Sequence, residues 1–591
     1  MIARTEVLIL VIAIVAAFVN AGFTKASQQQ DKELALLVLT AMSLLVLLRV
    51  IQFGIQWYLH RMPAAVRPPA PRKGRLIIPA IWAGMSLLCA VAPDSWLSTA
   101  DVRTQHQLWV RVTEGLLIIT ALLAALRLGR WLASITQNSS LLLAGSFLVL
   151  IAVGTLMLRL PMCRAVTAPM TEAQSAPWDV ALFTATSAAC VTGLIVEPTG
   201  SYWTTSGHVV ILFLIQFGGL GILTFGAFMA VLSRRQNWQF REAATLSELL
   251  DSESMLSARQ LLRTIVFFTI TTELIGAVCL LGLWDDEPAM WYSLFHSVSA
   301  FCNAGFSLRD EGLLGLSGRW QVAVAVSALI ILGGLGFSVI QDIWQNIIRR
   351  RVSGTAAGIL GQRAIRRRLS LHTRIVLVTA GWLLLIGGLG YLLFESLNVS
   401  RSETAGTLIQ DAWFQTVTFR TAGFNTVDHA TLHPATKLLA MFLMFIGAAP
   451  GSTGGGVKTV IFALMVLNLI AVMRGRDHVE VFGRMIPVHQ VSRSLAIIGA
   501  GLLVVLTTAG LLMVFEQAPH RSLDYLFEAT SAFATVGVSA GVTSDLSLPS
   551  RLVIIVVMFL GRIGPITLLL AMSGPKKAGS YSLPEERLSL G

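Results

Sequence analysis

The chain has 591 residues, of which 54% are hydrophobic and only 13% are charged, whereas charged residues make up about a quarter of an average soluble domain. This composition excludes an ordinary soluble protein and is typical of a polytopic membrane protein. The net charge of +12 does not predict nucleic-acid binding, because the basic residues lie in short loops between apolar segments, as they do in membrane proteins.

The N-terminal part of the chain contains four apolar segments, at roughly 6–23, 34–58, 75–92 and 109–127. Their lengths are close to the ~20 apolar residues that a membrane-spanning helix needs. The first segment is not followed by a small-residue cleavage site and a soluble domain, so it does not read as a cleaved signal peptide. We therefore expect residues 1–135 to form an extension of about four transmembrane helices.

Eight further apolar segments follow as four pairs. They lie at about 140–160 and 207–232, 262–284 and 321–347, 374–396 and 436–473, and 494–516 and 550–573. Twelve spans would leave both termini on the same side of the membrane. The arginine-rich and lysine-rich loops 59–75, 234–241, 349–374 and 474–493 then all fall on one face, which the positive-inside rule makes cytoplasmic. We expect a multi-pass protein of the plasma (cell inner) membrane with both termini in the cytoplasm.

Within each pair, the connection between the two spans follows one pattern. The four copies read ALFTATSAACVTGL (181–194), SLFHSVSAFCNAGF (293–306), AWFQTVTFRTAGF (412–424) and YLFEATSAFATVGV (525–538). Each has a glycine ten residues after an aromatic residue, at Gly193, Gly305, Gly423 and Gly537. A recurring period of this kind predicts four copies of one supersecondary unit. We assign the units to 136–245, 246–370, 371–485 and 486–575, followed by a cytoplasmic tail over 576–591.

Each connection is too short to span and ends in glycine, which predicts a re-entrant loop. Irregular backbone at membrane depth occurs where it lines protein or water, and rings of backbone carbonyls can replace the hydration shell of an ion. The fold class predicted is all-α, with four helix, re-entrant pore loop, helix (M1-P-M2) repeats around a central pore. The predicted filter comprises Val191, Thr192, Gly193, Asn303, Ala304, Gly305, Thr421, Ala422, Gly423, Thr535, Val536 and Gly537.

The second span of the third repeat contains GAAPGSTGGGVK (447–458). A proline and five glycines cannot sustain a helix here, because glycine costs about 1 kcal/mol and proline about 3 kcal/mol in a helix interior. The sequence predicts two half-helices and a flexible intramembrane loop, held by arginine, that gates the pore. The predicted gate residues are Gly451, Ser452, Thr453, Gly454, Gly455, Gly456, Lys458 and Arg562. For the two charged residues, snorkelling to the membrane interface is the alternative.

These motifs together carry a family resemblance over roughly residues 140–591. The four connections, GGLG (218–221 and 333–336), GSTGGGVKT (451–459), LGRIGP (560–565) and PEER (584–587) resemble the Trk/Ktr/HKT superfamily of potassium transporters, and most closely the bacterial Trk and Ktr membrane subunits. The resemblance implies one filter glycine per repeat, a homodimer and a cytosolic nucleotide-binding (RCK-type) regulatory ring. In the family, serine in place of the first filter glycine accompanies Na+ transport, so Gly193 favours K+. Four N-terminal helices exceed the two of Trk-type and the none of Ktr-type subunits, which leaves the subfamily and the regulatory partner open.

Other functions compete with K+ uptake. A Na+ or poorly selective monovalent cation transporter would share the fold. A secondary transporter with two long inverted halves disagrees with a period near 115 residues, and no catalytic motif predicts an enzyme. We expect no cofactor, K+ at the filter as the sole metal, lipid around the chain, and no nucleic acid. Asp428, His429 and His433 are interpreted as surface residues of an external loop rather than as a metal site.

Overall fold

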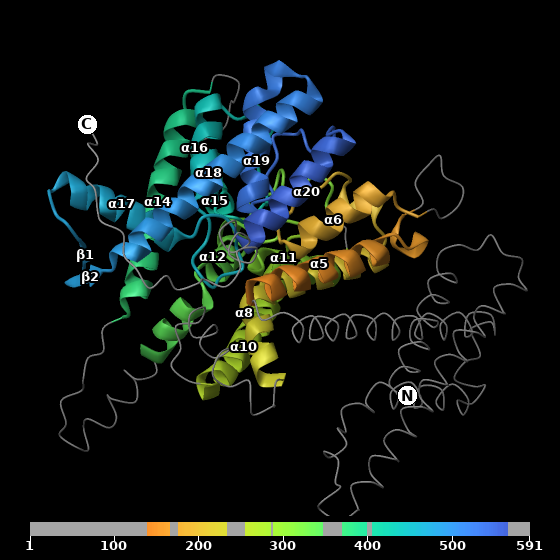
Figure 1. The fold of residues 1–591 in the computed structure, drawn as a ribbon. Helices are drawn as coiled ribbons and strands as arrows, with labels where there is room; N and C mark the ends of the chain where they lie inside the picture. Colours follow the sequence, from red (N-terminus) through yellow and green to blue (C-terminus); the bar gives the residue numbers. More distant parts are fainter. Residues whose placement is uncertain are drawn as a thin grey trace, which may run out of the picture. The chain divides into compact units, whose positions relative to one another are not determined.

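The computed structural model describes residues 139–165, 175–232, 255–284, 288–346, 369–398 and 405–564. The expected N-terminal extension, the tail, and the basic loops 59–75 and 234–241 lie outside the described residues, as does most of the loop 349–374. The described part is predominantly helical, as predicted (Figure 1). It divides into two compact units, one of which contains 149–182 and 200–211 and the other 139–148, 183–199 and the described residues from 212 onward.

The helices of the first two predicted repeats begin the described part. They are α5 (Ser139–Leu158), η4 (Pro161–Cys163), α6 (Trp178–Ala189), α7 (Thr199–Tyr202), α8 (Thr205–Leu232), α10 (Met255–Leu280), α11 (Ala289–Phe301), the π-helical turn η5 (Gln321–Val326) and α12 (Ser327–Gly334).

The third and fourth predicted repeats supply the remaining elements. They are α14 (Leu371–Glu395), α15 (Ala405–Thr418), η6 (His429–Thr431), α16 (Pro434–Phe445), α17 (Thr459–Met473), β1 (Val479–Val481), β2 (Arg484–Ile486), α18 (Val488–Glu516), η7 (Pro519–Arg521), α19 (Ser522–Ala534) and α20 (Leu548–Ile563).

In the smaller unit, polar contacts join residues 159–164 to residues 178–204. Thr204 Oγ1 donates to the carbonyl oxygen of Met162 over 2.6 Å, and Arg164 pairs with Trp203 in an isolated antiparallel bridge. The guanidinium carbon of Arg159 lies 3.7 Å from the centroid of a Trp178 ring. Arginine over an indole ring is a favourable cation–π arrangement.

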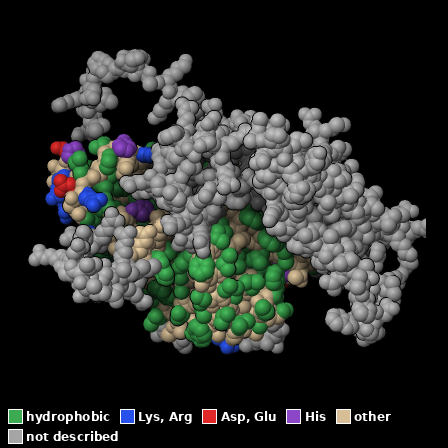
Figure 2. Space-filling view, turned by 90° about the horizontal axis from the view of Figure 1, so that it is seen from below, with side chains coloured by type: hydrophobic (Ala, Val, Ile, Leu, Met, Phe, Trp, Pro, Cys, Tyr) green, Lys and Arg blue, Asp and Glu red, His purple; other side chains and the backbone are tan. Residues whose placement is uncertain are grey.

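The larger unit has an apolar exterior. Among the described helices, α14 and α18 are each long and apolar enough to cross a membrane. Leu385, Leu389 and Leu393 of α14 are 51%, 61% and 60% exposed. Figure 2 shows one broad face that is almost free of charged side chains, while charged side chains gather at one edge. A surface that leaves so much leucine uncovered fits contact with lipid.

The predicted break in the second span of the third repeat is confirmed. Helix α16 ends at Phe445 and α17 begins at Thr459. Ile446 and Val457 form an isolated parallel bridge, so the two ends of the irregular segment meet. The segment 446–458, which we call the intramembrane loop, therefore leaves and rejoins the helical path at one place.

A second break was not predicted. We expected one span over 321–347, but the helix bends by 99° between Gln321–Gly334 and Phe337–Asn346. Gly336 has φ +85°, and Phe337 N donates to the carbonyl oxygen of Gly451 over 3.1 Å. A Cβ atom on Gly336 would lie 2.6 Å from the carbonyl oxygen of Pro450. The intramembrane loop thus takes over the hydrogen bonds that a straight helix would have used.

A short β-hairpin between α17 and α18 departs from the all-helical expectation. Strands β1 and β2 are antiparallel, with Val479 opposite Ile486. Both residues are buried in a cluster with Ala463 and Leu464 of α17 and Val491 of α18. The hairpin lies in the basic connection 474–493 and closes it into a packed turn.

Candidate functional site

The four aligned connections share one backbone conformation. Short helices α6, α11, α15 and α19 each end three to five residues before one of the four predicted filter glycines. Two residues before that glycine the backbone is left-handed in every copy, at Val191 (φ 57°), Asn303 (φ 58°), Thr421 (φ 71°) and Thr535 (φ 50°). The glycines themselves have φ between 71° and 92°. Non-glycine residues rarely have positive φ, so four matched occurrences indicate a built feature.

The four glycines meet in a closed ring. A Cβ atom on Gly305 would lie 2.7 Å from the Cα of Gly423, and one on Gly423 would lie 2.5 Å from the carbonyl oxygen of Val536. A Cβ on Gly537 would overlap the carbonyl oxygen of Thr192, and one on Gly193 that of Ala304. The order around the ring is therefore first, second, third, fourth and back to first. This arrangement brings together all four segments that were predicted to form the filter.

Hydroxyl groups of the short helices tie each connection to its own helix. Ser187 Oγ accepts from Gly193 N over 3.0 Å, and Ser531 Oγ accepts from Gly537 N over 3.1 Å. In the second and third copies, Ser299 and Thr418 donate to the carbonyl oxygens of Phe306 and Phe424. The helices also point their C-termini, which carry a partial negative charge, at the ring. The site is thus rigid, rich in backbone oxygen and electrostatically suited to a cation.

Glycines of the following helices let those helices reach the ends of the short helices. A Cβ atom on Gly218, Gly333 or Gly561 would overlap the carbonyl oxygen of Ala189, Phe301 or Phe533, respectively. Each of these carbonyls stands four residues before a filter glycine. The GGLG motif, which the sequence offered only as a recurring pattern, is explained by this close approach.

We predict that Gly333→Ala lowers the unfolding temperature of the purified protein, because the added methyl group cannot fit without moving the second connection. Overpacking of this kind costs about 1–3 kcal/mol. Gly381→Ala is the matched control, since that glycine is also helical and has nothing within 4 Å of the new Cβ. Thermal unfolding in detergent measures both, and equal effects would contradict the proposed role of Gly333.

The intramembrane loop lies directly against the ring. A Cβ atom on Gly454 would overlap Oγ1 of Thr421, and one on Gly455 would overlap Oγ1 of Thr535. Both hydroxyl oxygens are buried and have no hydrogen-bond partner among the described residues. Thr453 Oγ1 donates to the carbonyl oxygen of Phe301 over 3.3 Å. The loop therefore covers one end of the ring, where it meets the residues that precede the filter glycines by two.

Two cations, the buried Arg562 and the half-buried Lys458, hold the loop in place. Arg562, which is 5% exposed, donates to the carbonyl oxygen of Thr453 and to that of Gly218 over 2.6 Å. Lys458 Nζ donates to the carbonyl oxygen of Gly454 over 2.6 Å. Both side chains therefore donate to backbone acceptors within the protein.

Backbone hydrogen bonds to the second predicted repeat also hold the intramembrane loop. Ala449 N donates to the carbonyl oxygen of Gly334 over 3.0 Å, and Thr453 N to that of Gly333 over 3.2 Å. Within the loop, Gly451 and Gly456 have φ 69° and 68°, and Ser452 Oγ donates to the carbonyl oxygen of Ala449 over 2.6 Å. All the predicted gate residues except Arg562 lie in the loop, and Arg562 contacts it.

Comparison with known proteins identifies the family of this chain. The family model described as "TrkH: Cation transport protein" matches residues 135–580. The chain belongs to the TrkH family. The family is one of cation transport proteins and not of enzymes, as expected from the lack of catalytic motifs.

Similar sequences and one similar structure agree with the family. The chain is 37% identical over 423 residues to the Ktr system potassium uptake protein B of Vibrio alginolyticus, covering 71% of this chain and 89% of that one. It is 36% identical over 463 residues to the potassium/sodium uptake protein NtpJ of Enterococcus hirae, covering 76% and 96%. The crystal structure of the potassium transporter TrkH from Vibrio parahaemolyticus has a TM-score of 0.57, with 19% identity, 85% of this chain and 99% of that chain covered. That last likeness concerns the fold.

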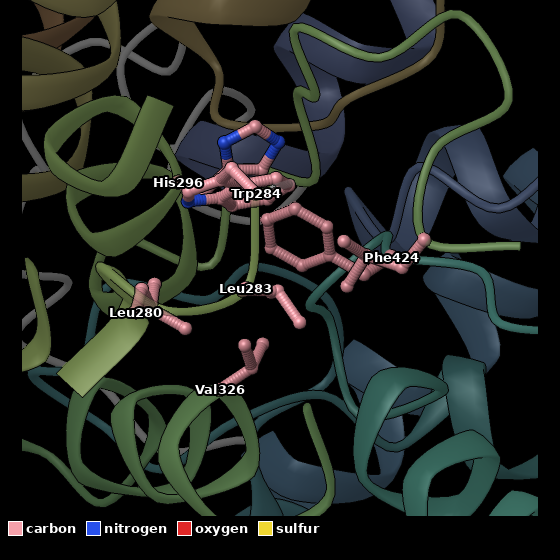
Figure 3. Close-up of a pocket in the computed structure, with 7 residues that line it drawn as sticks. Leu280, Leu283, Trp284, His296, Val326 and Phe424 are labelled. Carbon is pink, nitrogen blue, oxygen red and sulfur yellow. The ribbon is translucent and has the colours of Figure 1, made fainter. Parts of the chain in front are cut away.

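One pocket of this TrkH-family chain lies behind the second connection (Figure 3). Its lining is Leu280, Leu283, Trp284, His296, Leu313, Val326 and Phe424. The ring centroids of His296 and Trp284 are 4.4 Å apart. The lining is mostly apolar and joins residues near α10, α11 and η5 to Phe424 of the third connection.

Of the three residues interpreted as surface residues, the buried His429 needs a correction. His429 is 2% exposed, and its Nε2 lies 2.9 Å from Oε1 of Gln415 on α15. Asp428 and His433 instead cap short helices by accepting from Ala430 N and Ala435 N. Among the residues that the structure describes, no group of three or more potential metal ligands occurs. His429 therefore packs against α15 and supports the third connection.

Proposed function

We propose that this chain is the pore-forming subunit of a K+ uptake system of the plasma membrane. The supporting observation is the closed ring in which four glycines touch one another's backbones. Oxygens from four neighbouring connections can surround a dehydrated monovalent cation at such a ring. The filter comprises the residue triplets that end at Gly193, Gly305, Gly423 and Gly537.

We also propose that the four units predicted from the sequence, 136–245, 246–370, 371–485 and 486–575, are M1-P-M2 repeats around that pore. The shared backbone conformation of the four connections supports this assignment. The domain limits, the extension over 1–135 and a cytoplasmic location of both termini remain part of the proposal. The apolar exterior of the larger unit supports a multi-pass arrangement.

The intramembrane loop is the gate in this proposal. It packs on two unpartnered threonine hydroxyls at one end of the ring, where it would block the path of an ion. A loop held mainly by hydrogen bonds can have two arrangements that differ by a few kcal/mol, and a partner that prefers one of them shifts the population. Two relatives are named as components of a Ktr system, which supports a multi-component assembly. We therefore propose a homodimer regulated by a cytosolic nucleotide-binding ring.

A Na+ or poorly selective cation transporter is the second candidate, because one relative is named for both potassium and sodium. Purified protein in proteoliposomes separates the two. We expect K+ uptake that is largely unaffected by equal external Na+, and weak Na+ uptake when K+ is absent. Equal fluxes of the two ions would favour the second candidate, and no flux of either in vesicles with correctly folded protein would contradict both.

A further inference from the structure

The segment that follows the fourth filter glycine is tied to its short helix by a buried carboxylate. Glu528 of α19 is 0% exposed. Its Oε2 accepts from Ser539 Oγ over 2.8 Å, and its Oε1 accepts from Thr543 Oγ1. Thr543 Oγ1 also lies 2.9 Å from Ser539 Oγ. The carboxylate therefore gathers two hydroxyls from the chain that has just left the filter.

The second connection has an equivalent tie with different chemistry. His296 precedes Gly305 by nine residues and Ser307 follows it by two, the same positions that Glu528 and Ser539 occupy around Gly537. His296 Nε2 lies 2.9 Å from Ser307 Oγ. Since the first and third connections lie between the second and the fourth in the ring, the two equivalent ties stand on opposite sides of it.

The other two connections use different arrangements. In the third, Gln415 Nε2 donates to Thr426 Oγ1 over 3.1 Å. In the first, the equivalent positions hold Thr184 and Ile195, and isoleucine cannot form such a bond. The third connection also uses a buried carboxylate, because Asp411 Oδ1 of α15 accepts from Thr426 Oγ1 over 2.9 Å. Glu528 is, however, the one acidic side chain among the four residues that stand nine positions before a filter glycine.

A carboxylate is a costly choice for packing. Burying one is unfavourable unless it is well hydrogen-bonded or paired with a positive charge. No lysine or arginine forms a salt bridge with Glu528 within the described part of the chain. A neutral side chain such as glutamine would hold a hydroxyl at lower cost, so the choice of a carboxylate at this position points to a role beyond stability.

We propose that Glu528 is a positioning residue that sets the preference for K+ over Na+ by fixing the filter segment of the fourth connection. This inference rests on the proposed function above. Gly537 N is held by Ser531 from one side, and the Glu528–Ser539 bond holds the chain two residues later. The carbonyl of Gly537 lies between these two points, so the ties restrain it from moving inward to follow a smaller ion. Loosening the second point lets it close around Na+, which reduces discrimination.

Three variants test this in proteoliposomes, by the ratio of K+ to Na+ flux. Glu528→Gln keeps one acceptor oxygen, and Ser539→Ala removes the donor without touching α19. We expect either change to lower the ratio about three- to tenfold, which corresponds to ~0.7–1.4 kcal/mol at 1.4 kcal/mol per factor of ten. Asp524→Asn is the matched control. It makes the same carboxylate-to-amide change on α19, but Asp524 pairs with Lys437 over 2.8 Å and not with the filter segment.

The double variant Glu528→Gln/Ser539→Ala separates positioning from general damage. Because the two substitutions remove one shared contact, the double variant should lose no more selectivity than the stronger single variant. Additive losses, a wild-type ratio in both single variants, or an equal loss in Asp524→Asn would each overturn the proposal. Gly193→Ser in the same vesicles reports on the filter itself. If it alters the ratio while the Glu528 and Ser539 variants do not, this inference fails and the proposed function stands, whereas an unchanged ratio in all of them removes the filter assignment as well.

Discussion

The Gly193→Ser variant is expected to lose K+ preference over Na+ by about tenfold or more. A Cβ atom on Gly193 would overlap the carbonyl oxygen of Ala304 and lie 3.1 Å from the Cα of Gly305. The backbone there has φ 92°, which serine adopts only with strain. The filter segment of the first connection must shift away from that of the second connection, so the carbonyl ring no longer fits K+. A change of ~1.4 kcal/mol in relative ion binding is enough for a factor of ten.

The measurement is the K+ to Na+ flux ratio in proteoliposomes that contain equal amounts of folded protein. Gly315→Ser is the control, because Gly315 also has a left-handed backbone, φ 77°, but nothing lies within 4 Å of its Cβ position. It reproduces the backbone strain without touching the ring. A Gly193→Ser protein that folds and still discriminates as the wild type does would show that the ring is not the filter.

Shortening the intramembrane loop by deleting 451–456 is expected to raise K+ flux about tenfold while the flux ratio stays unchanged. Ile446 and Val457 already pair with each other, and Gly447 N donates to the carbonyl oxygen of Val457 over 2.8 Å. The deletion can therefore close without pulling α16 and α17 apart. It removes the glycines that pack on Thr421 and Thr535, which opens that end of the ring.

Arg562→Ala should raise flux in the same direction. It removes the bonds to Thr453 and Gly218, and hydrogen bonds to charged groups contribute about 1.5–3 kcal/mol each. Losing one of them shifts the balance between loop arrangements by about tenfold or more.

Arg551→Ala is the control for Arg562→Ala. Arg551 lies on the same helix, α20, but its Nε donates to the carbonyl oxygen of Leu546. Flux measured at fixed ion gradients, with the K+ to Na+ ratio recorded alongside, checks both gate variants. If the loop deletion reaches the membrane and conducts no faster than wild type, the loop is not the gate, and its glycines serve only close packing.

Some parts of the architecture followed from local sequence. The four connections were recognisable because the same residue types recur around Gly193, Gly305, Gly423 and Gly537, and a repeated local pattern folds in a repeated way. The break after Phe445 was predictable for a similar reason. Proline and closely spaced glycines disfavour helix whatever surrounds them, so position in the fold did not matter.

Other parts depended on residues that are distant in the chain. The bend at Gly336 was missed, because GGLG alone is compatible with a helix, as α8 demonstrates over the same motif. What bends the chain is the approach of Pro450 and Gly451. The contacts of Glu528 with Ser539 and Thr543 were not predicted either, because a carboxylate on a short helix has no local sign of its partner.

Composition and short local patterns were thus enough to predict a membrane protein, four similar connections with a glycine in each, and the helix break after Phe445. The tertiary structure was needed to find which connection touches which, where Arg562 finds its acceptors and what holds the chain after Gly537. Arg562 and Gly218 are 344 residues apart. Contacts over such separations form only when packed helices bring the backbones together, and no local pattern encodes them.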